Sequence, residues 1–268
     1  MTAYVVYDFE AIVDKDNPPP AGTDPDRVPA VPHLAIVSGA LIALVVEAGH
    51  IRVQPPRLLG GPLGGDEAAI LRDFVGMVGE RRPVLVSWNG RGFDLPLVIA
   101  RAVRHGVVAP WLWDRDFEDR YRGQKHLDLQ DAVSLRGAGR PSRMASFACL
   151  CGWPGKVGVD GSDVEGLWAK GPEGREAVRR YNLADVASEA AILLRLLVCR
   201  GDLTVHDYRE AARALLAHVD GDERLAVLRP EIDRDIFLLA EADGVEGAGQ
   251  GEVPGADVEG EPEAQAFR

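Results

Sequence analysis

Two carboxylates lie close together near the start of the chain. Residues 3–9 (AYVVYDF) form an apolar run typical of a short buried strand, and Asp8 and Glu10 stand at its end, two positions apart. Side chains alternate along a strand, so both carboxylates should lie on one face. Neighbouring carboxylates repel each other, and a hard divalent cation with oxygen ligands would relieve that repulsion. Taken alone, the pair is also compatible with a surface or helix-capping role.

A second polar group follows the predicted strand 84–88 (VLVSW). Asn89, Phe93 and Asp94 come directly after it, and sites in open α/β sheets gather at strand ends. The alternative is a turn at Asn89 followed by a helix that Asp94 caps. This alternative explains Asp94, but it leaves the spacing of Asn89 and Phe93 unexplained.

A third group, Tyr181 and Asp185, lies in the segment RYNLADVASE. The two residues are four positions apart on a predicted helix, so their side chains lie on one face, a turn apart. A carboxylate and a phenol that point together could bind a metal and position a water molecule. The alternative is an ordinary pair on a helix surface.

Hydrophobic periodicity predicts the elements that carry these residues. Strands are expected at residues 3–9, 34–46, 50–54, 84–88 and 126–129, with a turn at Ala48-Gly49. Helices are expected at residues 66–80, 95–105, 173–198 and 206–219. Three early strands followed by alternating helices and strands indicate an α/β fold, with a mixed sheet flanked by helices.

Composition is that of an ordinary globular chain. Apolar residues make up 46% of the 268 residues, and no apolar run approaches the roughly 18 residues that a membrane-spanning helix needs. The N-terminus lacks the features of a signal peptide, so we expect a cytoplasmic protein. The cysteines, Cys149, Cys151 and Cys199, form no CxxC pair, which favours buried reduced thiols over a zinc site.

Charge is distributed unevenly along the chain. The net charge is −12, but residues 220–268 alone hold 14 acidic and 4 basic residues. The nearly neutral remainder could still present a basic groove, although the balance argues against a protein that coats nucleic acid non-specifically. We expect residues 1–219 to form one domain and residues 220–268 an acidic C-terminal extension, largely disordered beyond about residue 240.

In this order the three groups are the motifs D-x-E, N-x3-F-D and Y-x3-D. The sequence resembles the DEDD exonuclease superfamily in its tyrosine-bearing (DEDDy) subclass, and more closely the bacterial family of predicted exonucleases related to the proofreading domain of family-B DNA polymerases. The likeness spans roughly residues 3–200 and includes the segments VSWNGRGFDLPLVIARAVRHG, HLDLQDAVS and LCGWPGKVGVDGSDV. Ala11 departs from the threonine usual after the glutamate, which puts a helper hydrogen bond in doubt but not the metal site. The other subclass has a histidine five residues before the last aspartate, where this chain has Arg180.

The resemblance implies a ribonuclease H-like fold and two magnesium or manganese ions held by four carboxylates, Asp8, Glu10, Asp94 and Asp185. Two cations suit phosphodiester hydrolysis, because charge must be stabilised on both the attacking and the departing oxygen. Tyr181 would align the attacking water and not act as the base, since an unperturbed tyrosine has a pKa of about 10.

Further residues are candidates for contacts around the metals. The resemblance gives Asn89 a contact with the substrate backbone, although turn formation would also account for it, and Phe93 belongs to the same motif. Arg143 could contact phosphates, but basic clusters are usually solvated surface. The basic residues near it in the sequence are Lys125, Arg136, Arg140 and Lys156. Asp128 could orient a ligand from outside the site, or could have a structural role at a strand end.

Likeness to a proofreading domain favours 3′–5′ hydrolysis of single-stranded DNA. RNA 3′ ends are the alternative, because no motif reads the 2′-hydroxyl. A non-catalytic nucleic-acid-binding module of the same fold is a further alternative, although all four carboxylates and the tyrosine are present. No feature indicates a membrane or an obligate protein partner. The acidic tail could bind a basic partner or aid solubility.

Overall fold

The structure is a computed structural model, and it describes residues 2–24, 27–47, 50–155, 157–159 and 161–240. Its strands are β1 (Thr2–Val13), β2 (Leu34–Glu47), β3 (His50–Val53), β4 (Arg57–Leu58), β5 (Val84–Ser87) and β6 (His126–Asp128). Its α-helices are α1 (Glu67–Arg81), α2 (Asp94–His105), α3 (Arg115–Glu118), α4 (Leu129–Val133), α5 (Met144–Leu150), α6 (Val164–Ala169), α7 (Pro172–Cys199), α8 (Val205–Gly221) and α9 (Arg234–Leu238). Short 3-10 helices are η1 (Val31–His33), η2 (Pro110–Trp113), η3 (Gly161–Asp163) and η4 (Glu223–Glu231).

The strands form one mixed sheet in the order β3-β2-β1-β5-β6, and β4 pairs with β2 outside this path. β1 pairs antiparallel with β2 and parallel with β5, and β5 pairs parallel with β6. The predicted mixed sheet and each predicted strand and long helix are confirmed, with ends that differ by a few residues. The turn expected at Ala48-Gly49 lies outside the described residues.

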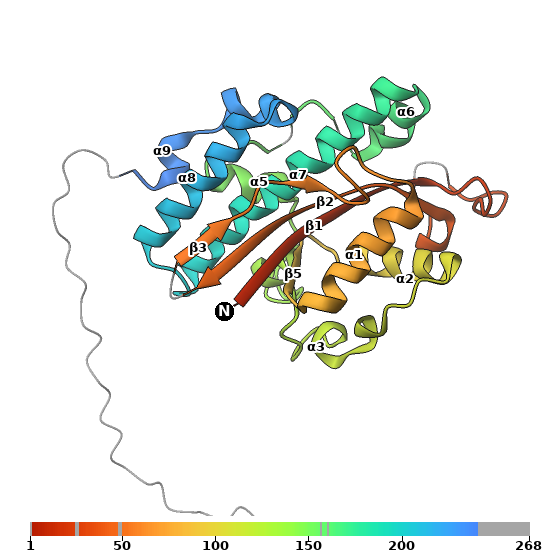
Figure 1. The fold of residues 1–268 in the computed structure, drawn as a ribbon, viewed down its shortest axis with the longest axis horizontal. Coiled ribbons are helices and arrows are strands. Elements are labelled where there is room, and N and C mark those ends of the chain that lie inside the picture. The colour runs from red at the N-terminus through yellow and green to blue at the C-terminus, as the bar shows by residue number, and fades with distance from the viewer. Residues whose placement is uncertain (1, 25–26, 48–49, 156, 160, 241–268) are drawn as a thin grey trace, which may run out of the picture.

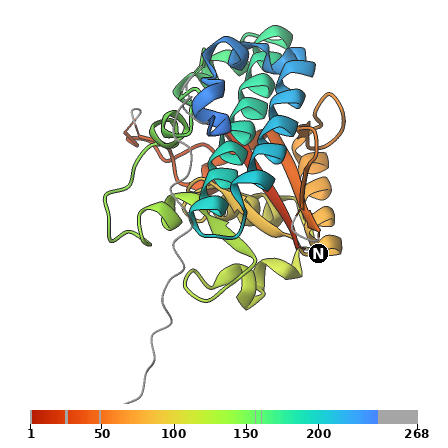
Figure 2. The same ribbon diagram turned by 90° about the vertical axis from the view of Figure 1, so that its left-hand side faces the viewer.

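Helices cover both faces of the sheet, with α7 and α8 on one face and α1 and α2 on the other (Figures 1 and 2). Alternation along β1 separates its side chains between these two layers. Val5, Tyr7 and Phe9 pack in the apolar layer with α1 and α2. Val6 packs with α7 and α8. Asp8 is two residues beyond Val6 on the strand, so its carboxylate lies on the same face, which α7 covers.

Close packing at the middle of the sheet fixes the register of β1. Phe9 pairs with Gly39 of β2, and a Cβ at Gly39 would lie 2.8 Å from the Phe9 ring. A larger residue at position 39 would therefore displace Phe9 and the strand that carries the two carboxylates. The register between β1 and β2 shifts directly after Glu10. Ile12, beyond this irregularity, packs against a small cluster that includes Val178 of α7.

A buried ion network joins the end of β1 to the two helices of the α1/α2 layer. Arg101 of α2 lies 2.6 Å from Asp14, which directly follows β1, and 2.6 Å from Glu67 of α1. The Arg101 and Asp14 side chains are only 5% and 7% exposed. Glu67 also accepts the backbone N–H of Ile36 on β2. One guanidinium thus connects β1, α1 and α2, and through Glu67 also β2.

Residues beyond the predicted boundary at 219/220 pack against α7 and α8. α8 crosses the boundary, and Leu225, Leu228 and Phe237 are buried in the same core layer. The domain boundary itself stays a prediction, and residues 241–268 lie outside the described residues. Within the described part of the chain, no helix combines the length and apolar character needed to cross a membrane. The prediction of buried thiols is wrong for Cys149 and Cys199, which are exposed, because both lie at helix ends.

Replacing Arg101 with alanine should destabilise the protein by about 3 kcal/mol, because Asp14 and Glu67 would be left buried without their shared cation. Urea unfolding followed by circular dichroism would measure the loss. Arg104→Ala is the matched control three residues further along α2, since Arg104 pairs with Asp16 at 3.0 Å between exposed side chains. The control should cost less than about 1 kcal/mol. Equal losses in the two variants would contradict a special role for the buried network.

Candidate active site

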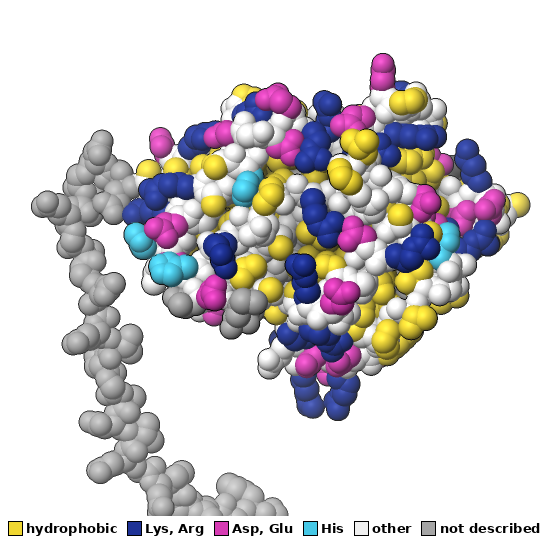
Figure 3. All heavy atoms as spheres, viewed as in Figure 1, with side chains coloured by type: hydrophobic (Ala, Val, Ile, Leu, Met, Phe, Trp, Pro, Cys, Tyr) yellow, Lys and Arg dark blue, Asp and Glu magenta, His cyan; other side chains and the backbone are white. Residues whose placement is uncertain are grey.

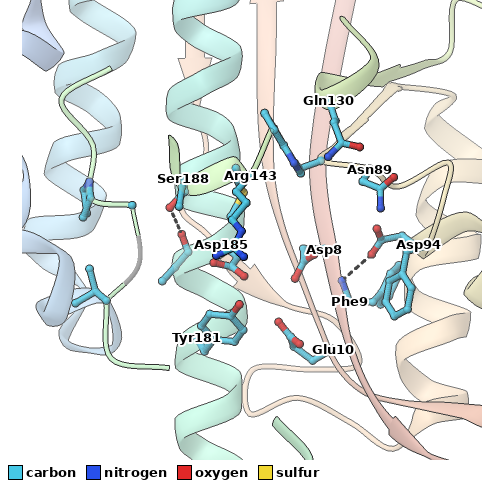
Figure 4. Close-up of a pocket in the computed structure, with 18 of the residues that line it drawn as sticks. Asp8, Phe9, Glu10, Asn89, Asp94, Gln130, Arg143, Tyr181, Asp185 and Ser188 are labelled. Atoms are coloured by element: carbon cyan, nitrogen blue, oxygen red, sulfur yellow. Dashed lines mark hydrogen bonds between the residues drawn. The ribbon is translucent and has the colours of Figure 1, made fainter. Parts of the chain in front are cut away.

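Carboxylates from β1 and α7 meet at the centre of the sheet face that α7 covers. One oxygen from each of Asp8, Glu10 and Asp185 can be chosen so that all three lie within 4.8 Å of one another. Figure 4 shows Asp185 and Tyr181 projecting from α7 towards Asp8 and Glu10. The two residues of β1 and the two of α7 are 171 or more positions apart in the chain, so the fold and not local sequence brings them together.

Asp94 lies on the other side of Asp8 in Figure 4. It is the first residue of α2, and its Oδ1 accepts the backbone N–H of Phe9 at 3.2 Å. The cap position belongs to Phe93, whose side chain makes no capping hydrogen bond. The capping alternative for Asp94 is therefore wrong, because its carboxylate turns towards β1. At 3% exposed, Asp94 is among the most buried acids of the chain.

Burial and like charge raise the pKa values of this group. Desolvation and the neighbouring Asp94 raise the pKa of Asp8 well above its usual range. Desolvation and Asp8 do the same to the pKa of Glu10, and the two carboxyls hydrogen-bond to each other. Burial raises the pKa of Asp94 to about 7. Without a cation, the site therefore retains protons near neutral pH.

Tyr181 lies one helical turn before Asp185 and is half-buried beside the carboxylates. Desolvation, and then the negative charge of Asp185, raises the pKa of the phenol far above 10. The hydroxyl is therefore neutral and available as a hydrogen-bond donor. This state suits the aligning role predicted for Tyr181 and excludes a phenolate base at neutral pH.

Asn182 holds Asp8 in place, and sequence reasoning missed it. Its Nδ2 donates to Asp8 Oδ2 at 2.6 Å, and its Oδ1 accepts from Ser38 Oγ on β2 at 2.8 Å. Asn182 and Ser38 are both buried. These two hydrogen bonds link Ser38 of β2 through Asn182 to Asp8, and they fix the orientation of the Asp8 carboxylate independently of any metal. A polar residue on the apolar face of a long helix was the available signal.

Glu189 is a further buried acid next to the site carboxylates, and sequence reasoning missed it as well. It lies one turn beyond Asp185 on α7 and is 2% exposed. Its Oε1 accepts the backbone N–H of Trp88 at 3.0 Å, at the end of β5, while Oε2 has no hydrogen-bond partner among the described residues. Desolvation, then Asp8, raises its pKa well above the usual range. Glu189 thus ties α7 to the start of the loop that carries Asn89.

The loop from β5 to α2 has a constrained backbone. Asn89 adopts a φ of 62°, a conformation that asparagine tolerates better than most residues. The next residue must be glycine, because a Cβ at Gly90 would lie 2.0 Å from Ser87 Oγ. Asp128 accepts the backbone N–H groups of Asn89 and Arg91 at 3.0 and 3.1 Å. The turn predicted at Asn89 is confirmed. Asp128 ends β6 and also accepts the backbone N–H groups of Gln130 and Asp131 at the start of α4, so it has the structural role at a strand end that was the alternative. Its role as an outer orienting group stays a prediction.

A pocket of about 440 Å³ surrounds the carboxylates. Asn89, Phe93 and Arg143, the predicted substrate contacts, all line it. Gln130 and Ser188 line it as well, and neither was predicted. Of the other basic residues near Arg143 in sequence, Lys125 donates to a backbone carbonyl elsewhere, and Lys156 lies outside the described residues. The basic strip therefore contributes Arg143 to the described lining of the pocket.

The donor set fits a divalent cation. Asp8, Glu10 and Asp185 offer only oxygen atoms, which hard cations such as magnesium and manganese prefer. Burial and the nearness of like charges raise the pKa values of Asp8 and Glu10, and a cation would relieve the same repulsion that protons relieve here. Asp94 is outside this cluster of three but lines the same pocket. Three carboxylates with a fourth nearby are thus available as ligands.

Fold and site together define an α/β protein with a carboxylate-lined pocket against its central strand. Residues 31–228 match a family described as a predicted 3′-5′ exonuclease related to the exonuclease domain of PolB, and the chain belongs to this family. Its members are predicted exonucleases, enzymes whose substrates are nucleic acids. Asp8 and Glu10 precede the matched residues, so their place in the site is supported by the geometry and not by the family match.

Among solved structures, the family B DNA polymerase from the hyperthermophilic archaeon Pyrobaculum calidifontis is similar, with a TM-score of 0.50 and 20% sequence identity. The likeness covers 84% of this chain and 29% of the polymerase chain. At this identity it shows the fold, which is ribonuclease H-like, as the sequence predicted. The chain thus spans less than a third of the polymerase's length. No curated protein matches the chain.

Raising the pH from about 6 to about 8 in the presence of a chelator should lower the Tm. The pKa of Asp94 is about 7 in the folded protein and 3.8 in the reference state. The folded state therefore binds more protons than the unfolded state, and stability falls as pH rises through the folded pKa. Manganese should abolish the fall by binding the deprotonated carboxylates. Scanning calorimetry of the wild type and of Asp94→Asn, which keeps an acceptor for Phe9, would test this; a wild-type Tm that is flat or rising over this range contradicts it.

Proposed function

We propose that this protein is a metal-dependent 3′–5′ exonuclease that hydrolyses the terminal phosphodiester bond of single-stranded DNA. Asp8, Glu10, Asp94 and Asp185 are the proposed cation ligands. The observation that carries the proposal is the convergence of Asp8, Glu10 and Asp185 oxygens within 4.8 Å inside a pocket. Membership of a family of predicted exonucleases supports the reaction class.

Two bound magnesium or manganese ions would supply the positive charge that stabilises the attacking and departing oxygens. The protein's part is to hold the ligands rigidly. Asn182 orients Asp8, and the Phe9 backbone N–H orients Asp94. Tyr181, kept neutral by burial beside Asp185, aligns the attacking water through its hydroxyl. Such preorganisation is where most of the catalytic advantage of a site of this kind arises.

A terminal nucleotide suits the pocket better than a duplex does. Its volume of about 440 Å³ is in the range of small-molecule sites. Phe93 offers a ring to the sugar or base, and Asn89 and Arg143 offer polar and cationic contacts to the backbone. Elsewhere, basic and acidic side chains are interspersed on the face seen in Figure 3. Binding should therefore depend on the pocket and its immediate surroundings.

Asp185→Asn should reduce the degradation of a 5′-labelled single-stranded oligonucleotide by roughly 10²-fold or more, since misplacement by about 1 Å can cost that much. Tyr181→Phe should lower kcat less and leave KM nearly unchanged, because it removes an aligning hydroxyl and no ligand. Glu80→Gln, an exposed acid on α1 across the sheet, is the matched control and should retain full activity. Wild-type-like activity of Asp185→Asn would sink the proposed ligand set.

DNA should be degraded faster than RNA of the same sequence. The support is the family's relation to the exonuclease domain of a DNA polymerase. Single-stranded DNA and RNA with a 5′ label, each incubated with manganese and resolved on a denaturing gel, measure the preference. A ladder that shortens from the 3′ end is expected. A preference for RNA would favour the alternative of an exoribonuclease, while an endonucleolytic pattern on both would contradict the proposed polarity.

A further inference from the structure

A second pocket, of about 530 Å³, adjoins the candidate active site. Asn89 and Gln130 line both pockets, so these two amide side chains form part of a shared wall. The second pocket lies between the start of α2 and the segment that contains η2 and α3. If the 3′ end of a nucleic-acid strand occupied the first pocket, the nucleotides just before that end would lie close to the second pocket.

An exposed tryptophan stands at the second pocket. Trp113, the last residue of η2, is 65% exposed, whereas Trp111 and Trp153 are 4% and 1% exposed. Leu95 and Ile99 of α2 continue the apolar wall beside it. A large aromatic ring that is exposed to water at a concave surface indicates a ligand-binding site more often than an ordinary surface residue does.

Charge in the second pocket does not favour a phosphate group. Among its described lining residues the basic side chains are Arg91 and Arg120, and both are engaged. The Arg91 guanidinium donates to three backbone carbonyl oxygens, and Arg120 contacts Asp131 at 2.5 and 2.8 Å. Glu118 and Asp128 add negative charge to the same lining. An uncharged planar group therefore suits this pocket better than an anion.

We propose that the second pocket binds a nucleobase of the substrate strand, 5′ to the nucleotide in the first pocket, and that Trp113 stacks on this base. The inference rests on the proposed function, because that function places the 3′ end in the first pocket. Stacking on an aromatic ring tolerates any base, so the contact would add affinity without sequence preference. The sugar-phosphate backbone would then pass the amides of Asn89 and Gln130.

Binding of labelled thymidine monophosphate and of oligothymidylates of two, four and six nucleotides in a chelator tests the proposal without hydrolysis. Wild-type affinity should rise from the mononucleotide to the oligonucleotides, and Trp113→Ala should lose about tenfold on the oligonucleotides while binding the mononucleotide as the wild type does. Trp113→Phe should retain most of the gain with length. Leu63→Ala, which removes an exposed apolar side chain that lines neither pocket, is the control and should match the wild type.

A length dependence in Trp113→Ala equal to that of the wild type would overturn the inference, and so would an equal loss on every length. A matching Tm for the two proteins shows that the variant folds. Cleavage assays with manganese on the same oligonucleotides separate the two proposals. If the wild type cleaves but Trp113→Ala keeps the wild-type length dependence, only the second pocket's role fails. If the wild type shows length-dependent binding through Trp113 but no cleavage, only the catalytic function fails.

Discussion

Repulsion among buried carboxylates is the constraint on which the rest of the structure depends. Asp8, Glu10 and Asp185 approach within 4.8 Å, and each acid beside them adds negative charge in a desolvated place. Such a cluster opposes folding unless protons or cations neutralise it. Stability must therefore come from elsewhere, from the two apolar layers around the sheet and from the network of Arg101. The apolar packing and this network offset the unfavourable free energy of the carboxylate cluster.

Side chains alternate between the two faces of β1, and this separates the carboxylates from the aromatic core. The odd-numbered residues Tyr7 and Phe9 pack against Phe74 of α1 in tilted and edge-to-face arrangements, with ring centroids 4.9 and 5.1 Å from that ring. The even-numbered Asp8 and Glu10 face α7. The aromatic packing on one face holds the backbone in position, and the backbone fixes where the carboxylates on the other face lie. A single strand thus serves the core and the site at once, and the small residue Gly39 opposite Phe9 allows the packing to be tight.

Much of this arrangement could be predicted from the sequence. The apolar run ending at Asp8, the helix carrying Tyr181 and Asp185, and the strand before Asn89 all have strong periodicity, and the structure contains each of them. The ligand set itself stays a prediction, supported by the geometry. The contacts of Asn182 and Glu189 could not be predicted, because a polar residue in a helix gives no sign of which distant atom it will meet. Short elements such as η2 and α3 lack a periodic pattern, so the second pocket was also hidden from sequence reasoning.

The loop at Asn89 shows how the three motif segments come to act as one unit. Glu189 on α7 holds its start through the Trp88 N–H, and Asp128 on β6 holds its middle through the Asn89 and Arg91 N–H groups. The loop ends at Asp94, whose carboxylate binds the backbone of β1. Two carboxylates, Glu189 and Asp128, therefore hold the backbone of this loop. A third, Asp94 at its end, ties the loop to β1. Since the same loop supplies walls to both pockets, any shift in it would change the carboxylate-lined pocket and its neighbour together. Under the proposed function, this loop would couple the position of a bound nucleic acid to the position of its terminal phosphate beside the carboxylates.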